Sequence, residues 1–353
     1  MLELHRDAAW YLRQAVASTS PSRSPDIPAV AGVDILAYGE PMVEFNQTRE
    51  AGGRQYLQGF GGDSSNFAIA AARQGARVGY FSAVGDDHNG RMLRALWDEE
   101  GVLHADVKTD AAAFTAIYFV THGASGHEFH FFRSGSAASR LQPADVPCQR
   151  IAGAQVLHLS GISLALSPAA CDTGYAAIHT AREAGVKVSF DTNLRLKLWS
   201  IHRARAVMND VMRLADICLP SYDDVLAITG IEEPEALVDH CLRLGAKTVA
   251  LKLGHAGAIV ADATERHHIG PYPCRPIDAT GAGDTFGGAF VARLVAGDTL
   301  LDAGQYAAAA AALSTEGYGA VAPIPRAPDV RAALRRSTRT TTSGGGKHTM
   351  EPP

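Results

Sequence analysis

The sequence has few cysteines, no excess of basic residues and no long apolar run. Because its cysteines are odd in number, widely spaced and without a C-x-x-C pair, we expect neither a disulfide framework nor a zinc site. They are interpreted as buried free thiols at Cys148, Cys171, Cys218, Cys241 and Cys274. The 32 lysines and arginines against 37 aspartates and glutamates give a net charge of −5, which argues against a nucleic-acid-binding protein. No membrane span or secretory signal is predicted, so we expect a cytoplasmic protein.

Histidines are more numerous, but their spacing does not indicate a metal centre. The 14 histidines include His122, His127 and His130, which lie close together in the sequence. No H-E-x-x-H motif and no nearby cysteine accompany them, so no structural metal site is expected.

The chain is long enough for one large α/β domain or two smaller ones, with 353 residues of which 46% are hydrophobic. Residues 1–30 are interpreted as an N-terminal extension, and residues 31–335 as the folded domain. Residues 336–353 are polar and rich in Thr, Gly and Pro, which predicts a disordered tail.

Within the folded domain, short apolar runs alternate with helical patterns, which is typical of a parallel sheet covered by helices on both faces. The predicted strands are residues 33–38, 78–83, 156–159, 186–190, 217–219 and 248–252, and the predicted helices are residues 65–74, 90–100, 169–184, 201–215 and 233–244. Ligands are expected along the edge where the strands end.

Two stretches break this pattern. Residues 41–58 and 114–133 contain alternating apolar and polar residues with no intervening helix, which predicts half-exposed antiparallel strands. They are interpreted as a small sheet that covers the open edge of the main domain as a lid. The alternative is a simple edge hairpin.

The 35 glycines are about one residue in ten, above the average of ~7%, and the most informative of them precede a helix. Gly281, Ala282 and Gly283 form a turn that exposes backbone N–H groups at a helix N-terminus, where anions bind. Asp284 follows at once, and its carboxylate would repel a resting phosphate. It suits a general base that takes a proton from a hydroxyl during phosphoryl transfer. Alternatively, Asp284 is only a favourable first-turn acid. A dinucleotide-binding loop fits less well, because the spacing is G-x-G-x-x-x-G.

Two motifs carry a family resemblance. Residues 278–284, with the sequence D-A-T-G-A-G-D, resemble the C-terminal signature of the ribokinase-like (PfkB) carbohydrate kinases. Residues 61–68, followed by residues 73–76 and 84–87, resemble the N-terminal signature of that family. The resemblance covers residues 32–330. It implies a ribokinase-like α/β/α sandwich with a mainly parallel central sheet and a small β-strand lid.

The same resemblance implies ATP with Mg²⁺ as cofactors and a small-molecule sugar as substrate. Asp284 would act as the base, and the backbone of Gly281, Ala282 and Gly283 would form an anion hole. Gly61 and Gly62 would let the backbone approach the sugar. The side chain of Asn66 would hydrogen-bond the sugar hydroxyls, and Lys252, Gly254 and Gly257 would form the nucleotide loop.

Three segments resemble those of the family's kinases for 2-keto-3-deoxygluconate, a sugar acid: residues 39–43, 131–137 and 191–199. In that case Tyr118, Phe132 and Arg133 of the lid would contact the substrate, with Arg133 on its carboxylate. Arg195 would also meet the carboxylate or, alternatively, the ATP phosphates, with Asn193 near the nucleotide. Charge-assisted bonds of this kind are about twice as strong as neutral ones.

The sequence departs from the family pattern in two places. The usual N-x-x-E segment is replaced by Ser221 to Asp224, so Ser221 would contact the nucleotide and Asp224 would bind Mg²⁺ indirectly, through water. Phe131 and Phe132 stand where the lid commonly has tyrosines.

The expected activity is therefore ATP-dependent phosphorylation of a primary hydroxyl of a sugar acid. The alternatives are a kinase for a neutral ketose such as fructose, a kinase for another keto-sugar acid, and a non-catalytic sugar-binding regulator. An NAD-dependent oxidoreductase is a more distant alternative. The lid strands could also pair between subunits of a homo-oligomer.

Overall fold

The structure, a computed structural model, describes residues 32–48, 53–123 and 126–343. The predicted N-terminal extension therefore lies outside the described residues. Within these ranges, no helix combines the length and the apolar character that a membrane span requires.

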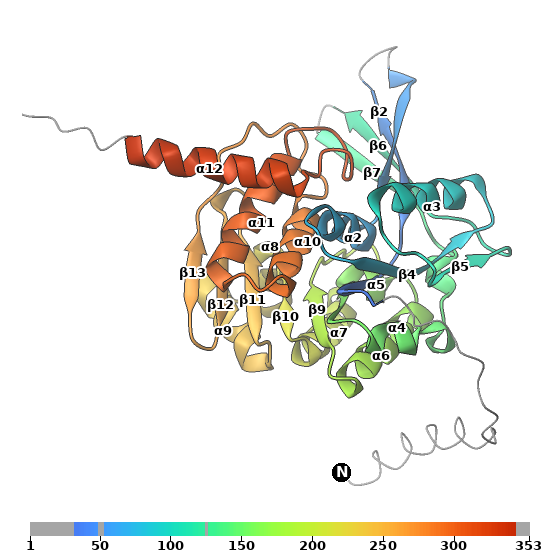
Figure 1. Cartoon of the computed structure of the whole chain (residues 1–353). Helices are drawn as coiled ribbons and strands as arrows, with labels where there is room; N and C mark the ends of the chain where they lie inside the picture. Colours follow the sequence, from blue (N-terminus) through green and yellow to red (C-terminus); the bar gives the residue numbers. More distant parts are fainter. Residues whose placement is uncertain (1–31, 49–52, 124–125, 344–353) are drawn as a thin grey trace, which may run out of the picture. The chain divides into compact units, whose positions relative to one another are not determined.

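The centre of the fold is a nine-stranded sheet with the order β13-β12-β11-β10-β9-β8-β1-β4-β5 (Figure 1). Neighbours from β11 to β5 pair in parallel, and only β12 and β13 pair antiparallel. The strands are β1 Ile35–Tyr38, β4 Val78–Gly85, β5 Val107–Asp110, β8 Val156–Ser160, β9 Lys187–Asp191, β10 Ile217–Cys218, β11 Thr248–Lys252, β12 Ala258–Asp262 and β13 Arg266–Ile269. The predicted strands are confirmed. Strands β5, β12 and β13 were not predicted. Of these, β5 and β13 are short and polar, and they form the two edges of the sheet.

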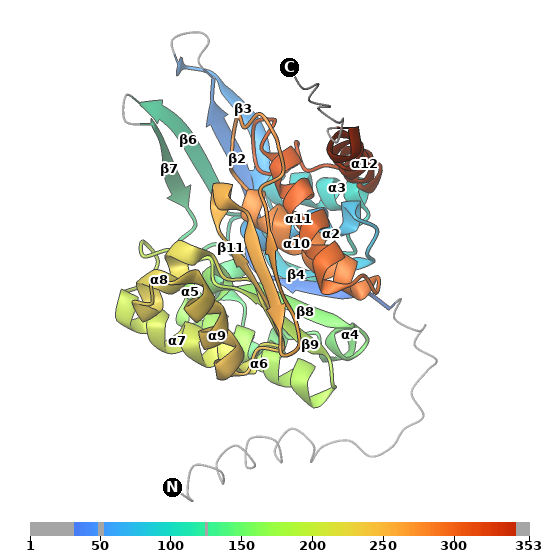
Figure 2. The ribbon, with the colours of Figure 1, turned by 90° about the vertical axis from the view of Figure 1, so that its left-hand side faces the viewer.

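Helices cover both faces of this sheet (Figure 2), as the α/β pattern predicted. One face carries α2 Asp63–Arg73, α3 His88–Glu100, α10 Ala282–Val295, α11 Leu300–Ser314 and α12 Ala327–Ser343. The other carries α4 Cys148–Ala152, α5 Gly161–Ala165, α6 Pro168–Glu183, α7 Ile201–Leu214, α8 Tyr222–Thr229 and α9 Pro234–Leu244. Single 3-10 turns lie at Ala138–Arg140, Pro143–Asp145 and Gly254–Ala256.

Alternate residues of each strand enter different cores. In β1, Ile35 and Ala37 belong to the core under α2 and α10, whereas Leu36 and Tyr38 belong to the core under α6 and α7. A strand buried on both faces reads as a continuous apolar run. This is why the central strands were visible in the sequence.

The predicted lid is a separate four-stranded sheet with the order β3-β2-β6-β7. Its strands are β2 Met42–Gln47, β3 Tyr56–Gly61, β6 Ile117–Gly123 and β7 Gly126–Phe132. The antiparallel expectation is correct for the β2–β3 and β6–β7 pairs, but wrong for the central pair, because β2 and β6 are parallel. The chain enters β2 from the end of β1 and β6 from the end of β5. Since β1 and β5 end at the same edge of the main sheet, β2 and β6 run in the same direction.

Two further expectations need correction. Helix α12 continues to Ser343, although disorder was predicted from residue 336; residues 344–353 lie outside the described ranges. Val330 and Ala333 of α12 are buried, so packing starts a helix that the polar residues beyond it extend. The five cysteines are free, as expected, but Cys148 at the start of α4 is exposed and Cys274 is half-buried.

Helix α10 packs against α2 through glycines. A Cβ atom on Gly288 would lie 2.5 Å from the Phe67 carbonyl oxygen and 3.0 Å from the Ala71 nitrogen. Both atoms belong to the backbone of α2 and cannot turn away. The two helices can therefore approach this closely only while position 288 has no side chain.

We expect Gly288→Ala to lower the free energy of unfolding by about 1–3 kcal/mol, because the added methyl group overpacks the contact between α10 and α2. Urea denaturation measures this. Gly270→Ala is the control, since a Cβ atom there meets no atom within 4 Å, and it should change stability by no more than about 0.5 kcal/mol. Equal stability of the two variants would contradict the contact.

Candidate active site

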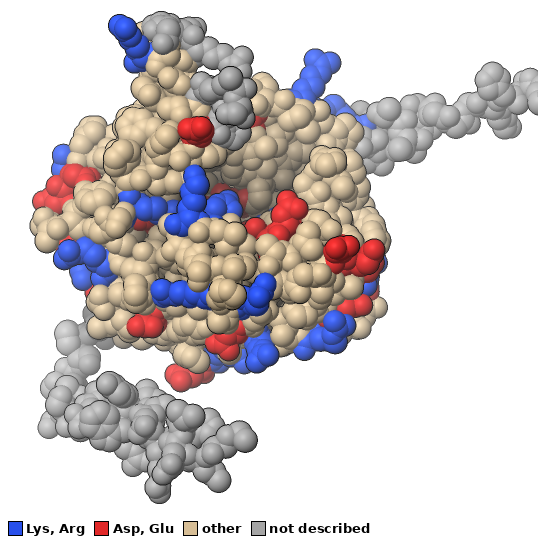
Figure 3. Space-filling model, turned by 180° about the vertical axis from the view of Figure 1, so that it is seen from behind, with Lys and Arg blue, Asp and Glu red and all other residues tan. Residues whose placement is uncertain are grey.

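A cavity of about 720 Å³ lies between the lid and the edge where the parallel strands end. Figure 3 shows Lys and Arg side chains gathered around a hollow on this side of the molecule. The lining comes from several segments: Gly62, Asp63 and Asn66; Tyr118, Phe129, Phe131 and Arg133; Asp191 and Asn193 to Leu198; Ser221, Asp223, Asp224 and Lys252; and Asp278 to Gly281, Gly283 and Asp284. The predicted ligand edge is thus hollowed, and most of the predicted site residues line it.

Asp284 lies in the first turn of α10 at the inner end of this cavity. Gly281 caps the helix with a φ of 75°, in the left-handed region that favours glycine. Asn66 Nδ2 donates a hydrogen bond of 2.8 Å to Asp284 Oδ2, across a sequence separation of 218 residues. The two sequence motifs therefore meet in space, and Asn66 orients the carboxylate.

The carboxylates of the site carry unusual proton affinities. Burial, reinforced by the negative charge of Asp63, raises the pKa of Asp284 to about 8. Burial also raises the pKa of Asp191, while Lys252 Nζ, 2.5 Å from Asp191 Oδ2, opposes this shift. A cluster of acids in a cleft with perturbed pKa values is typical of a catalytic site, where a group must exchange a proton near neutral pH.

The segment after β9 is held by side chains from other elements. Of the residues that the structure describes, Asn193 is the one non-glycine residue with a positive φ, 32°. Its Nδ2 donates to Asp63 Oδ2 at 2.9 Å. Asp224 Oδ2 accepts hydrogen bonds of 3.1 Å from the Leu194 nitrogen and from Thr192 Oγ1. These bonds fix the turn that carries Arg195 to the edge of the cavity, where its side chain is exposed.

The lid presents one face to the cavity. Tyr118 of β6 and Phe131 of β7 point into it, with ring centroids 5.5 Å apart. Phe132, predicted to contact the substrate, is on the other face of β7, where it packs edge-on against Phe119 and is 56% exposed. The prediction of Phe132 is therefore wrong, because successive residues of a strand point to opposite faces. Gly61 must lack a side chain, since a Cβ atom there would lie 2.4 Å from the Tyr118 hydroxyl.

Arg133 also lines the cavity, but it already has a carboxylate partner. Its Nη2 lies 2.5 Å from Glu40 Oε2, and its guanidinium lies over the ring of Phe131, 5.6 Å from the centroid. Glu40 is fully buried and also accepts a hydrogen bond from Ser136 Oγ. The positive charge of Arg133 is thus balanced by the protein before any ligand arrives.

A second cavity of about 620 Å³ adjoins the first and shares Lys252, Ala279 and Gly283 with it. Gly254 and Gly257, both predicted to bind the nucleotide, line this second cavity with Tyr272, Phe286 and Ala312. A Cβ atom on Gly257 would lie 2.0 Å from the Ile269 carbonyl oxygen. That glycine therefore serves the close packing of the loop against β13, as well as leaving the cavity open.

Sequence reasoning missed Asp63 and Glu40. The first could have been found, because Asp63 follows a glycine turn at a helix start just as Asp284 does. Glu40 had no such signal. It is a single acid between two apolar strands, and only the fold brings it to Arg133.

Comparison with known proteins identifies the family of the chain. The model of the pfkB family carbohydrate kinases matches residues 33–327. A 2-dehydro-3-deoxygluconokinase of Thermoproteus tenax is 35% identical over 312 residues, which cover 85% of this chain and 94% of that protein. Fructokinase-2 of Solanum habrochaites is 32% identical over 322 residues, covering 85% and 96% of the two chains.

Among solved structures, a putative Ribokinase II of E. coli in complex with ATP and Mg²⁺ superposes with a TM-score of 0.80. It is 28% identical, and the match covers 86% of this chain and 99% of that one. The fold and the site thus define a carbohydrate kinase with the ribokinase-like architecture. The chain belongs to the PfkB family of carbohydrate kinases.

The raised pKa of Asp284 predicts a pH-dependent stability difference. Because the folded-state value of about 8 exceeds the usual 3.8, the folded protein binds the extra proton, and its stability falls as the pH rises from 4 to 8. Asp284→Asn buries no charge and keeps an acceptor for Asn66. We therefore expect a higher Tm than the wild type at pH 9 and a similar Tm at pH 4, by thermal unfolding.

The control for this experiment is Asp302→Asn, which removes an exposed acid from the first turn of α11. A stabilisation by Asp284→Asn that is the same at both pH values would contradict the assigned pKa.

Proposed function

We propose that the protein transfers the γ-phosphoryl group of ATP to a primary hydroxyl of 2-keto-3-deoxygluconate. The observation that carries this proposal is the pairing of Asp284 with the open helix start before it. A carboxylate with a pKa of about 8 lies beside backbone N–H groups at the junction of the two cavities. A proton acceptor and an anion site are thus placed side by side.

Each part has a separate task in the transfer. Asp284 accepts the proton of the attacking hydroxyl, and Asn66 keeps its carboxylate oriented. The N–H groups of Gly283 and Asp284 stabilise the negative charge that develops on the transferring group, whereas the Ala282 N–H donates to the Ala279 carbonyl oxygen at 3.2 Å. Gly283 leaves the approach open, since the nearest atom to a Cβ there is Lys252 Nζ at 3.7 Å.

The second cavity suits the adenosine of ATP, and Lys252 suits its phosphates. Tyr272 and Phe286 offer apolar surface for a base, and Gly254 and Gly257 keep the entrance wide. Lys252 lines both cavities, so its amine can contact a phosphate where they meet. Asp191 fixes that amine from behind.

The residues present also fit Mg²⁺. This ion is usually held by one or two carboxylates together with substrate phosphates and water, so it needs no all-protein cage. Among the described residues, no group of three or more acidic, histidine or cysteine side chains is arranged for a metal. Asp223 and Asp224 line the cavity beside Ser221 and would hold the ion with the phosphates. There it would neutralise phosphate charge.

The preference for a sugar acid rests on the exposed cations of the cavity. Arg195 and Lys197 both line it with exposed side chains, and Arg195 Nη1 donates to the Leu194 carbonyl oxygen at 2.8 Å. They remain available to a substrate carboxylate, whereas Arg133 is engaged by Glu40. The similarity to the Thermoproteus tenax enzyme supports the same substrate.

The second candidate function is phosphorylation of a neutral ketose such as fructose. The Arg133–Glu40 ion pair favours it, because this pair leaves the lid side of the cavity without net charge. The similarity to plant fructokinases supports it as well. A screen of sugars and sugar acids with ATP and Mg²⁺, followed by ADP release, separates the two functions.

We expect Asp284→Asn to lower turnover by about 10²- to 10⁴-fold, the usual contribution of a general base. Nucleotide binding should persist, since the second cavity is untouched. A coupled ADP-release assay measures turnover, and Asp302→Asn is the matched control. Turnover near that of the wild type would exclude Asp284 as the base.

Arg195→Gln should raise KM for 2-keto-3-deoxygluconate by about 10-fold or more, because one charge-assisted hydrogen bond is lost. KM for fructose should change much less. Arg213→Gln, an exposed arginine outside the cavity lining, is the control. An increase in KM for ATP in place of the sugar acid would assign Arg195 to the phosphates.

A further inference from the structure

The helix start before Asp284 depends on a segment from the far end of the chain. Residues 315–326 connect α11 to α12, and several of them contact the turn formed by residues 278–281. The Gly319 nitrogen donates to Asp278 Oδ2 at 2.9 Å, and the Asp278 nitrogen donates to the Thr315 carbonyl at 3.1 Å. The Ala320 carbonyl oxygen lies 2.9 Å from the place of a Cβ on Gly281. This segment therefore supports the turn that aims the N–H groups.

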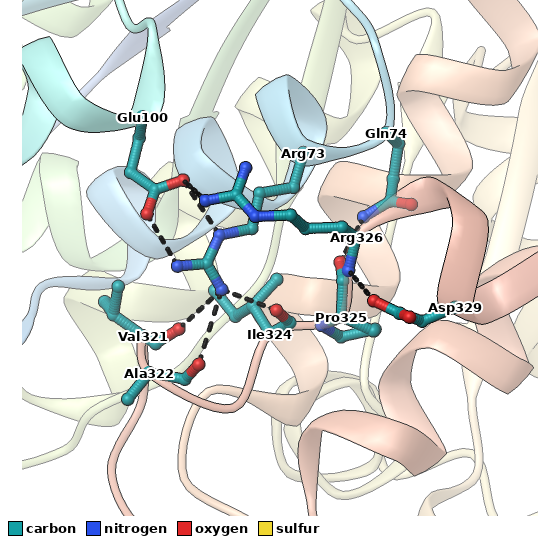
Figure 4. A network of polar contacts seen from close by, with 9 residues as sticks. All are labelled: Arg73, Gln74, Glu100, Val321, Ala322, Ile324, Pro325, Arg326 and Asp329. Carbon is teal, nitrogen blue, oxygen red and sulfur yellow. Dashed lines mark hydrogen bonds and ion pairs between the residues drawn. The ribbon is translucent and has the colours of Figure 1, made fainter.

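Arg73 is the side chain that makes the most contacts with this segment among those drawn in Figure 4. Arg73 Nη1 donates to the carbonyl oxygens of Val321 at 3.1 Å and Ile324 at 2.5 Å. Its Nε and Nη2 donate to the two carboxylate oxygens of Glu100, at 2.9 and 2.7 Å. The planar guanidinium thus joins the last turn of α2, the end of α3 and the segment before α12. A lysine cannot reproduce this fork of donors.

The Arg73–Glu100 pair is buried, with side-chain exposures of 9% and 7%. A buried ion pair contributes little net stability, because desolvation offsets the attraction. Its effect here is geometric, because it fixes the direction in which Arg73 presents Nη1 to the carbonyls. Gln74 adds a second attachment, since its Nε2 donates to the Pro325 carbonyl at 2.9 Å.

Both ends of helix α2 therefore act on the start of α10, one directly and one through the segment before α12. Asn66, near its first turn, contacts the Asp284 carboxylate, and Arg73, in its last turn, holds the segment behind Gly281. We propose that Arg73 is a positioning residue for phosphoryl transfer, which keeps the N–H groups at the start of α10 aimed into the cavity. This inference rests on the proposed role of that helix start as the anion site.

The test is Arg73→Lys, which keeps the positive charge beside Glu100 but loses the fork. We expect kcat to fall on the order of 10²-fold, as for small displacements of a catalytic group. KM for the sugar and Kd for ADP should change little, because neither cavity loses a lining residue. Backbone hydrogen exchange at Asp278, Ala282 and Gly319, whose N–H groups are hydrogen-bonded in and behind the turn, should become faster. Arg77→Lys, which alters an exposed ion pair with Asp34, is the matched control and should keep wild-type kcat.

Unchanged kcat in a folded Arg73→Lys protein would overturn the proposal. A loss of kcat that only follows the folded fraction, or that is accompanied by an equal loss of ADP binding, would also overturn it, because the role would then be structural. If Arg73→Lys does not fold, the Arg73→Met/Glu100→Leu double variant replaces it, since an apolar pair can substitute for a buried ion pair. Failure of both variants to fold would again assign a structural role.

The hydrogen-exchange measurement separates this inference from the proposed function. If the wild type phosphorylates no sugar, the proposed function fails. Faster exchange at Asp278, Ala282 and Gly319 in Arg73→Lys would still support a positioning role of Arg73, and unchanged exchange at all three would exclude it.

Discussion

The close approach of α2 and α10 is the constraint on which the site depends. The helices come from opposite ends of the folded domain and meet across Gly288, which has no room for a side chain. Only this distance allows Asn66 to reach Asp284. Both helices pack on the same face of the main sheet, and Phe67 of α2 and Phe290 of α10 belong to the same hydrophobic core. The close packing of α2 on α10 therefore sets the distance between Asn66 and Asp284, and the contacts of Arg73 add to it at the other end of α2.

The site also concentrates negative charge. Asp63, Asp191 and Asp284 interact unfavourably with one another, and Lys252 is the cation that offsets them inside the cavity. Such an arrangement is costly in the ligand-free protein, because buried like charges raise each other's pKa. The same repulsion makes Asp284 a stronger proton acceptor, because it raises the affinity of the carboxylate for a proton. These positions therefore lower the free energy of unfolding while they raise the proton affinity of Asp284.

Sequence patterns predicted the elements that are buried along their whole length or that carry a complete motif. The central strands are buried on both faces, and residues 278–284 contain their own chemistry, so both were visible without the fold. The direction of β6 relative to β2 was not predictable, because it depends on where β1 and β5 end in the sheet. The prediction for Phe132 was wrong for a related reason. The register of β7 decides which of its residues face the cavity, and a shift of one residue exchanges the two faces. The pairing of Glu40 with Arg133 was hidden because the two residues are distant in sequence, although each lies in a segment that carries the family resemblance.

The Glu40–Arg133 pair has a consequence for how the lid is attached. Glu40 stands just before β2, where the chain enters the lid, and Arg133 stands just after β7, where the chain leaves it. The ion pair therefore ties together the entry and the exit of a sheet whose two central strands run side by side from the same edge. The lid consists of two hairpins, and this ion pair links the start of the first to the end of the second. Because Glu40 is fully buried, the pair holds the start of β2 beside the end of β7, so a displacement of one hairpin at this point would be passed to the other.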